Sequence, residues 1–477
     1  MHESALPSEI AFVKWSRRLL GVAFGLGLFV IVAATLLAPT LVPYVPLGIL
    51  GTVAGVWLFR HPSLNLLLVL ALFPLIAGFE EGVDLGEFAF GVYFATYLAS
   101  WYFGVIFLER TPLVRTFQDR MVVFLFLWVT GFVLISFIFG AEPVAIRNEY
   151  IPFMMLGFYF PVKRMCADER GVRALLILLL WMGLYVTVRN YLTLQQIISK
   201  ATQVWQITQK GRAESNEILL LCPAFAMLTW ASFTRTALRK TVLFALFLFI
   251  TLGLVLTQSR GYWAGAAVGG IVMLFVLDKP RRIQLITMAS IGIALAVGLV
   301  VLLFGGRSLL LTAGLWNRVS SIGPTVVSDI SLINRWLESK VVWGKIVENP
   351  ILGYGMGVPY EYYNLTISGT MKWSFIHNGY LSMWYRFGIV GFVVSMVIWV
   401  TAIAKGIRIA RITDNRYRAI LCVLATSVLC SMLVSAITSG PFYQMDTLLV
   451  LTMLFAFVSA AADATKETST ADKNLVI

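Results

Sequence analysis

The sequence predicts an all-α integral membrane protein that crosses the bilayer about 12 to 14 times and carries one large outer loop. Of the 477 residues, 59% are hydrophobic and only 13% are charged, so polar side chains are too few to cover a water-exposed surface. The apolar residues also gather into runs of roughly 20, which cross about 30 Å of hydrocarbon as a helix. We therefore expect one membrane domain without a separate soluble half.

The first apolar run, residues 19–38, follows a basic cluster and exceeds the ~7–15 residues of a signal-peptide core, so we expect it to stay as a membrane helix. The run 150–162 is short and could be re-entrant. The other expected spans lie near 41–59, 63–79, 85–108, 121–140, 172–192, 216–233, 241–257, 261–277, 283–304, 379–404, 419–438 and 443–462. This divides the chain into membrane helices over 1–304, a loop over 305–376, membrane helices over 377–462 and a tail over 463–477.

The charges predict the orientation. Roughly two thirds of the 37 Lys and Arg residues fall in alternate short loops, which places those loops and both termini in the cytoplasm. Because the basic residues are dispersed in this way, the net charge of +13 does not indicate nucleic-acid binding. The four cysteines, of which three lie in apolar runs, suit neither a disulfide framework nor a metal site.

The outer loop is expected to contain an amphipathic helix. Apolar residues recur at helical spacing between Leu332 and Val341, and Asn349–Pro350 ends the pattern. Asn334, Arg335 and Glu338 lie off the apolar stripe, so we expect the helix to lie on the outer surface with Arg335 on its polar side. The following glycines, ILGYGMG, lack the ending of a phosphate-binding loop and predict only a tight turn.

His377 begins the most informative stretch, SFIHNGYLSMWYRFGIVG over residues 374–391. The chain has only three histidines, and the predicted topology puts His377 alone on the outer side. A histidine at the start of a membrane helix can simply be satisfied by backbone groups or lipid headgroups. It can also serve as a titratable base, and the neighbouring cations decide between these roles.

Arg260 lies between two expected spans with almost no loop around it. Burying an arginine near hydrocarbon costs about 2.5–3.5 kcal/mol, so it needs an anionic partner, either a lipid phosphate or a phosphorylated ligand. Arg212 and Arg335 are expected on the same outer side. Three cations and one base on one face fit a pyrophosphate leaving group and an attacking hydroxyl.

The strings TQSRG (257–261), RWLESKVVWGKIVENPILGYGMG (335–357) and HNGYLSMWYRFGIVG (377–391) resemble the bacterial O-antigen ligase and polymerase superfamily. The resemblance covers roughly residues 210–400, and ligases of this family usually have about twelve spans. It implies a transferase of the inner membrane that moves a glycan from undecaprenyl pyrophosphate, on the periplasmic face, to an acceptor sugar such as lipid A core. It also implies inverting chemistry with neither metal nor cofactor.

The resemblance further implies roles for individual residues. Arg260 and Arg335 match the phosphate-binding arginines, His377 matches the histidine that activates the acceptor, and Arg212 is similar to a further family arginine. Asn378 is expected to orient the imidazole or to hydrogen-bond a sugar. Trp373 is expected to stack on a sugar or to anchor the chain at the membrane interface.

Three alternatives stay open at this point. A polymerase of the same superfamily would extend the glycan on its carrier. A metal-dependent transferase would use the acidic loop that contains Glu80, Glu81, Asp84 and Glu87. A transporter or lipid flippase is disfavoured because the sequence has neither inverted repeats nor charged residues deep in its apolar runs.

Overall fold

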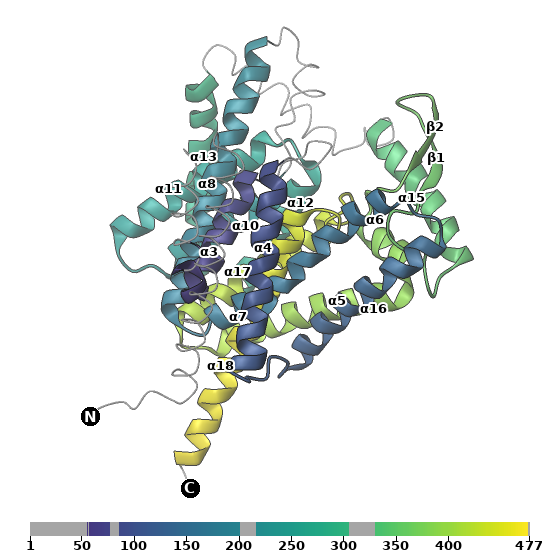
Figure 1. The fold of residues 1–477 in the computed structure, drawn as a ribbon. Helices are drawn as coiled ribbons and strands as arrows, with labels where there is room; N and C mark the ends of the chain where they lie inside the picture. The colour runs from purple at the N-terminus through teal and green to yellow at the C-terminus, as the bar shows by residue number, and fades with distance from the viewer. Residues whose placement is uncertain (1–54, 56, 77–84, 201–215, 305–329, 476–477) are drawn as a thin grey trace, which may run out of the picture. The chain divides into compact units, whose positions relative to one another are not determined.

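The computed structural model describes residues 55, 57–76, 85–200, 216–304 and 330–475, and these residues are almost entirely helical (Figure 1). The expected span 19–38 and most of 41–59 therefore lie outside the described residues. The chain divides into two compact units, Met1–Arg115 and Thr116–Ile477. Each unit is described by itself.

The first unit contains α3 (Pro62–Ile76) and α4 (Leu85–Phe103), and α4 continues into one π-helical stretch, η2 (Gly104–Leu108). The two helices pack through Phe73 and Phe90, whose ring centroids are 6.4 Å apart. The Tyr93 hydroxyl donates a hydrogen bond to Asn65 Oδ1 across the same contact. The expected spans 63–79 and 85–108 correspond to these helices.

The second unit holds the remaining elements. They are α5 (Phe117–Ile138), α6 (Pro143–Tyr150), the 3-10 helix η3 (Ile151–Phe158), α7 (Tyr159–Met165), α8 (Glu169–Lys200), α10 (Ile218–Phe233), α11 (Ala237–Leu256), α12 (Arg260–Val276), α13 (Lys279–Phe304), α15 (Ile330–Glu348), β1 (Tyr360–Asn364), β2 (Gly369–Trp373), α16 (Gly379–Ile412), α17 (Arg416–Ser435) and α18 (Met445–Leu475). The short run 150–162 is thus a broken segment of α6, η3 and α7.

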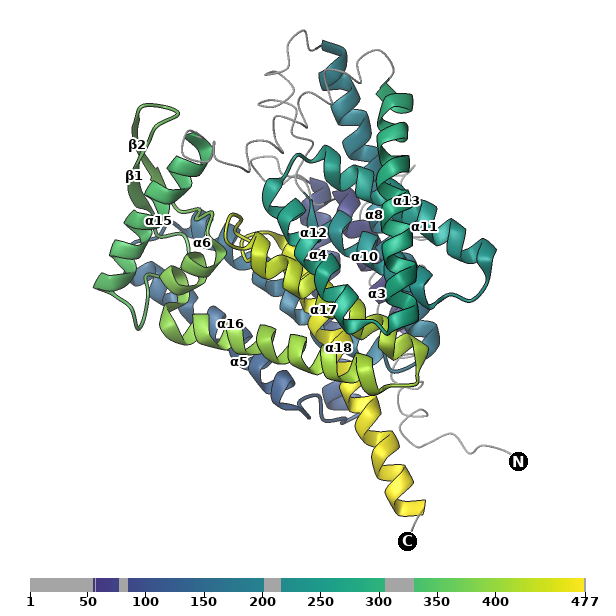
Figure 2. The ribbon, with the colours of Figure 1, turned by 180° about the vertical axis from the view of Figure 1, so that it is seen from behind.

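Among the described residues, seven helices are long and apolar enough to cross a membrane, and three shorter apolar helices accompany them. This confirms the all-α, multi-pass membrane class. The most enclosed of the seven are Arg416–Ser435 and Met445–Thr465, so α17 and α18 form the centre of the second unit. Figure 2 shows α17 and α18 running between α16 and the group of α10 to α13.

The packing of α12 on α17 positions one side of the site. Gly261, Gly265 and Gly269 recur every four residues on α12, and a Cβ atom at any of them would lie 2.4 Å or less from a side-chain oxygen of Thr438, Ser435 or Ser431. The small residues let the two backbones approach closely, as is common between membrane helices. The N-terminal end of α12, which begins with Arg260, is therefore held against the C-terminal end of α17.

The described part of the loop expected over 305–376 contains α15 and a two-stranded antiparallel hairpin in which Tyr360 pairs with Trp373. The amphipathic helix is confirmed, and the predicted turn after it is formed by glycines with φ of 70° at Gly353 and 89° at Gly355. The direction in which α15 faces differs from the prediction. The polar residues Asn334 and Glu338 are buried, whereas Trp336 of the apolar stripe is 62% exposed.

The helix α16 is kinked at Gly388, whose φ is +63°. The chain after α15 crosses α16 at this point, because the backbone N–H groups of Tyr354 and Gly355 donate to the carbonyls of Tyr385 and Arg386 at 2.7 and 2.9 Å. A Cβ at position 388 would overlap Ile351 O, so only glycine fits there. The kink at Gly388 lets the glycine turn pack directly on the first half of α16.

Candidate active site

A turn over residues 436–440, just after α17, is the meeting point of the predicted site residues. Arg335 Nη1 on α15 donates to Thr438 O at 2.9 Å. Gly261, next to Arg260, packs against the Thr438 side chain. Gly379 N, two residues after His377, donates to Ala436 O at 2.8 Å. The structure thus brings Arg260, Arg335 and the segment carrying His377 around one turn.

His377 is paired with a buried carboxylate. Its Nδ1 lies 2.7 Å from Glu338 Oε2, and its backbone N–H donates to Glu338 Oε1 at 3.2 Å. The Glu338 side chain is only 2% exposed, whereas that of His377 is 35% exposed. With Nδ1–H donating to the carboxylate, a neutral imidazole carries its lone pair on Nε2. His377 and Glu338 therefore have the geometry of a base and the carboxylate that orients it.

Tyr360 of β1 completes the environment of this pair. Its hydroxyl lies within hydrogen-bonding distance of Glu338 Oε1 and 2.6 Å from Phe375 O. Burial, and then the charge of Glu338, raise the pKa of Tyr360, so the phenol stays protonated and can act as a donor. The hairpin thereby helps to satisfy the buried carboxylate and fixes the backbone two residues before His377.

Arg260 is the first residue of α12 and follows a tight turn. Only Thr257, Gln258 and Ser259 separate α11 from α12, and Gln258 has a left-handed φ of +56°. Such a backbone conformation is uncommon for a residue other than glycine and often marks a functional turn. It turns the chain sharply enough to put Arg260, which is half-buried, at the helix end. The positive end of the α12 dipole adds to the charge of the guanidinium.

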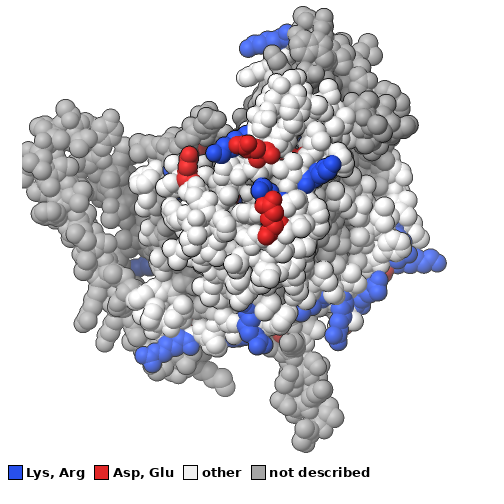
Figure 3. Space-filling model, turned by 90° about the vertical axis from the view of Figure 1, so that its right-hand side faces the viewer, with Lys and Arg blue, Asp and Glu red and all other residues white. Residues whose placement is uncertain are grey.

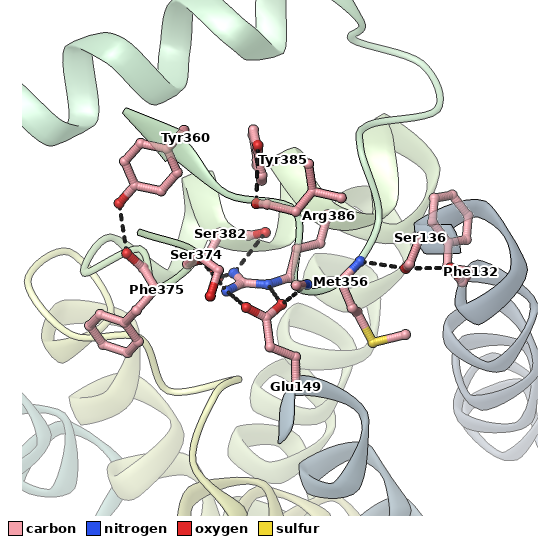
Figure 4. A network of polar contacts seen from close by, with 12 residues as sticks. Phe132, Ser136, Glu149, Met356, Tyr360, Ser374, Phe375, Ser382, Tyr385 and Arg386 are labelled. Atoms are coloured by element: carbon pink, nitrogen blue, oxygen red, sulfur yellow. Dashed lines mark hydrogen bonds and ion pairs between the residues drawn. The ribbon is translucent and has the colours of Figure 1, made fainter. Parts of the chain in front are cut away.

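A buried ion pair lies beside the residues that precede His377 (Figure 4). Arg386 of α16 binds Glu149 of α6 through Nε at 2.5 Å and Nη2 at 3.0 Å. Arg386 Nη2 also donates to Ser374 O at 3.0 Å, and Gly357 N donates to Glu149 Oε2 at 2.8 Å. Both charged side chains are almost fully buried. The pair ties the glycine turn, α6 and the residues before His377 into one unit.

This ion pair corrects one inference from the sequence, namely that the apolar runs contain no deeply placed charge. Arg386 lies inside the expected span 379–404, and Glu149 is its partner. A buried arginine in a membrane helix needs such a partner. In this protein the pair joins α6 and α16 to Gly357 and Ser374, which flank the hairpin.

We expect removal of one partner of this pair to destabilise the protein strongly. Glu149→Ala leaves a buried guanidinium without its carboxylate, which typically costs about 3–5 kcal/mol. The expected result is a clear fall in the melting temperature of the detergent-solubilised protein. Glu142→Ala, at the exposed N-cap position of α6, is the control and should change little, because its side chain makes no cap hydrogen bond. Equal melting temperatures for the two variants would contradict the bracing role.

A second buried cluster lies beside the α11–α12 turn. Arg189 Nη2 of α8 donates to Asn216 Oδ1 at 2.6 Å, and Asn216 Nδ2 donates to Asp446 Oδ2 at 2.9 Å. Tyr262 of α12 lies close enough to Asp446 to interact with its charge. Through Asp446 and Tyr262, this cluster connects a further arginine, Arg189, to the first turn of α12, which begins with Arg260. In the sequence, the only feature that could have pointed to Asp446 is that it is a single carboxylate at the start of an apolar run.

The other predicted site residues that the structure describes do not take part in the contacts around the turn 436–440 described above. Arg212 lies outside the described residues. Asn378 is the N-cap of α16, where its Oδ1 accepts hydrogen bonds from the backbone of Tyr380 and Leu381 at 3.0 and 3.1 Å, and a role in substrate binding stays a prediction. Trp373 ends β2 and is 43% exposed. Within the described part of the chain, no three His, Cys, Asp or Glu side chains gather as metal ligands would.

Glu338, Glu149, Arg386 and Asp446 were not singled out as site residues from the sequence. Glu338 had a partial signal, because it falls three residues after Arg335 and both lie off the apolar stripe of the helix. The pairing of Glu149 with Arg386 joins residues 237 positions apart and had no local signal.

One family model matches part of the chain. Residues 244–396, about a third of the chain, match the family model described as O-antigen ligase. The matched region includes Arg260, Arg335, Glu338 and His377. No curated protein matches the chain. Residues 244–396 are thus similar to the O-antigen ligase domain of the O-antigen ligase and polymerase superfamily.

Proposed function

We propose that this protein is a ligase-type glycosyltransferase that moves a glycan from undecaprenyl pyrophosphate to a sugar hydroxyl of an acceptor such as lipid A core. The observation that carries the proposal is the His377–Glu338 pair, with Nδ1 and Oε2 2.7 Å apart, in a unit where Arg260 and Arg335 flank the same turn. A base oriented by a carboxylate and two nearby guanidinium groups match the two halves of a displacement at an anomeric carbon.

His377 acts on the acceptor. The acceptor hydroxyl donates its proton to Nε2 while its oxygen attacks the anomeric carbon of the donor sugar. The new glycosidic bond forms as the bond between that carbon and the pyrophosphate oxygen breaks, with inversion of configuration. Glu338 holds the imidazole in the required tautomer and stabilises the positive charge that the ring gains.

The arginines act on the leaving group. As the bond to the sugar breaks, negative charge builds up on the pyrophosphate, and a guanidinium fork can bind its oxygens through two charge-assisted hydrogen bonds. Arg260, Arg335 and Arg189 are the cations that we assign to this charge, and Arg212 is a further candidate. Trp373 and Asn378 are the residues that we assign to the sugars.

We further propose that the site lies on the periplasmic side of the bacterial inner membrane, with both termini in the cytoplasm and membrane lipids around the helices. The distribution of Lys and Arg supports this orientation. A cysteine at exposed Thr370, in a variant without the four native cysteines, should react with an impermeant thiol reagent added from the periplasmic side. Protection until the membrane is permeabilised would contradict the orientation.

Replacement of Glu338 tests its positioning role. Glu338→Gln keeps the shape of the side chain but removes its charge, so we expect kcat to fall roughly 10²-fold while donor affinity is kept. Glu361→Gln, at an exposed position of the hairpin, is the control and should alter neither quantity. A purely structural role for Glu338 would instead lower donor affinity and rate together.

The glycan intermediates of a deletion strain test the ligase assignment. Loss of a ligase leaves long glycan attached to the lipid carrier, because polymerisation continues without transfer. Loss of a polymerase instead leaves single repeat units on the acceptor. The proposal predicts the first result, and the second would assign the protein to polymerisation.

A further inference from the structure

The helix α15 buries two polar residues and exposes three large apolar ones, although Val342 and Ile346 face the core and the charged Lys340 and Glu348 are exposed. Asn334 and Glu338 are 8% and 1% exposed. Trp336, Trp343 and Val347 are 62%, 48% and 61% exposed, and their spacing of seven and four residues puts them on one stripe of the helix. In water, a surface helix normally shows the opposite arrangement. The outward stripe therefore needs an apolar environment.

The contacts of α15 show where this stripe lies. Glu338 contacts His377, Trp343 packs on Trp384 with ring centroids 5.6 Å apart, and Pro350 O accepts a hydrogen bond from Ile389 N. From the first contact to the last, both chain segments advance by the same number of residues, so α15 runs side by side with the first turns of α16. Helix α16 is itself long and apolar enough to cross the membrane.

The exposed stripe is continuous with the surface of that membrane helix. Trp384 stacks on Phe392 at 5.4 Å, and the adjoining Val393 is 46% exposed. Ile351 and Leu352, just beyond the end of α15, are 65% and 51% exposed where the chain crosses Gly388. The chain just after α15 thus lies beside Gly388, which is nine residues after the first residue of α16.

We infer that the outward stripe of α15 lies in the bilayer, with Trp336, Trp343, Val347, Ile351 and Leu352 contacting the phospholipids of the leaflet on that side. Tryptophan is enriched at membrane interfaces, and a helix with one apolar face settles there. Lys340, whose amine lies 5.6 Å above the Trp336 ring, is placed to reach the lipid phosphates. Figure 3 shows this side of the molecule with charged side chains gathered in its upper middle and a broad uncharged area below them.

This contact has a consequence for the opposite face of the same helix. Because the stripe fixes the depth of α15, it holds Glu338 and His377 close to the level of the lipid headgroups. A pyrophosphate joined to a membrane lipid would lie at that level. The inference itself needs only that the chain is a membrane protein, and it does not rest on the proposed transfer reaction.

Nitroxide accessibility in proteoliposomes tests the lipid contact. Trp343→Cys and Val347→Cys, each spin-labelled in the full-length protein without its native cysteines, report how readily the label meets oxygen, which concentrates in lipid, or a water-soluble nickel complex. Glu361→Cys and Lys372→Cys are the matched controls, because both positions are exposed on the neighbouring hairpin. All four positions are at the surface, so the labels should not disturb the fold.

The expected result is a several-fold higher ratio of oxygen to nickel accessibility at positions 343 and 347 than at 361 and 372. The same high ratio should appear at Ile351→Cys, which provides a second position if either helix variant fails to fold. Equal ratios at all positions would place α15 in water and overturn the inference. The readout involves no glycan, so it is independent of whether the protein transfers one.

Discussion

Replacement of His377 by alanine is expected to slow glycan transfer by about 10²–10⁴-fold while donor binding stays close to that of the parent protein. A sugar hydroxyl is a weak nucleophile at neutral pH, and Nε2 of His377 is the group that we assign to take its proton. The affinity for the donor should come mainly from the pyrophosphate and the lipid, which His377 does not bind in this account. Donor affinity and single-turnover transfer, measured side by side, check the prediction.

The control for this variant is His61→Ala. His61 is the other described histidine, is exposed and hydrogen-bonds through Nδ1 to Trp57 O at 2.9 Å in the first unit. It should leave both measurements unchanged. If His377→Ala instead lost donor binding and kept its rate at saturation, the histidine would be a binding residue. The base would then have to be sought in the acidic loop, among Glu80, Glu81, Asp84 and Glu87.

Replacement of Arg260 by lysine is expected to lower kcat/KM by roughly 10²-fold or more, although the charge is kept. Lysine cannot form the planar fork that binds two phosphate oxygens at once, and its ammonium group would occupy a different point above α12. Arg260→Ala should impair transfer further and weaken donor binding as well. Binding and single-turnover assays of the two variants separate geometry from charge.

Arg281→Lys is the matched control, because Arg281 lies at the start of α13, near the opposite end of α12 from Arg260. It makes a surface pair with Asp278, so the same change should have little effect there. Near-normal turnover of Arg260→Lys would contradict the fork and leave Arg260 with a simple electrostatic or lipid-anchoring role.

The membrane helices of the described residues could be predicted closely from the sequence, because a span is set by local composition over about 20 residues. The expected spans 121–140 and 379–404 correspond to α5 (Phe117–Ile138) and the first part of α16 (Gly379–Ile412). The amphipathic pattern likewise located α15. The hairpin β1–β2 was not foreseen, because its two strands are short and mixed in character.

The residues that support the site could not be predicted in the same way. Glu338 is an ordinary surface residue by sequence, and only the packing of α15 against residues 375–377 makes it the partner of the histidine. The inward direction of α15 was also missed, since helical periodicity identifies two faces without saying which one the protein covers. Arg386 and Glu149 meet through tertiary structure alone.

The most direct test of the central claim is a single-turnover reaction of the purified protein in proteoliposomes that contain undecaprenyl pyrophosphate-linked glycan and an acceptor. The reaction is run in the presence of a chelator, with the parent protein and His377→Ala in parallel. We predict that the parent protein forms new glycosidic bonds and releases undecaprenyl pyrophosphate in equal amount, and that His377→Ala does so very slowly. Movement of the lipid-linked glycan across the bilayer without a new bond, or transfer that requires added Mg²⁺ or Mn²⁺, would contradict the claim.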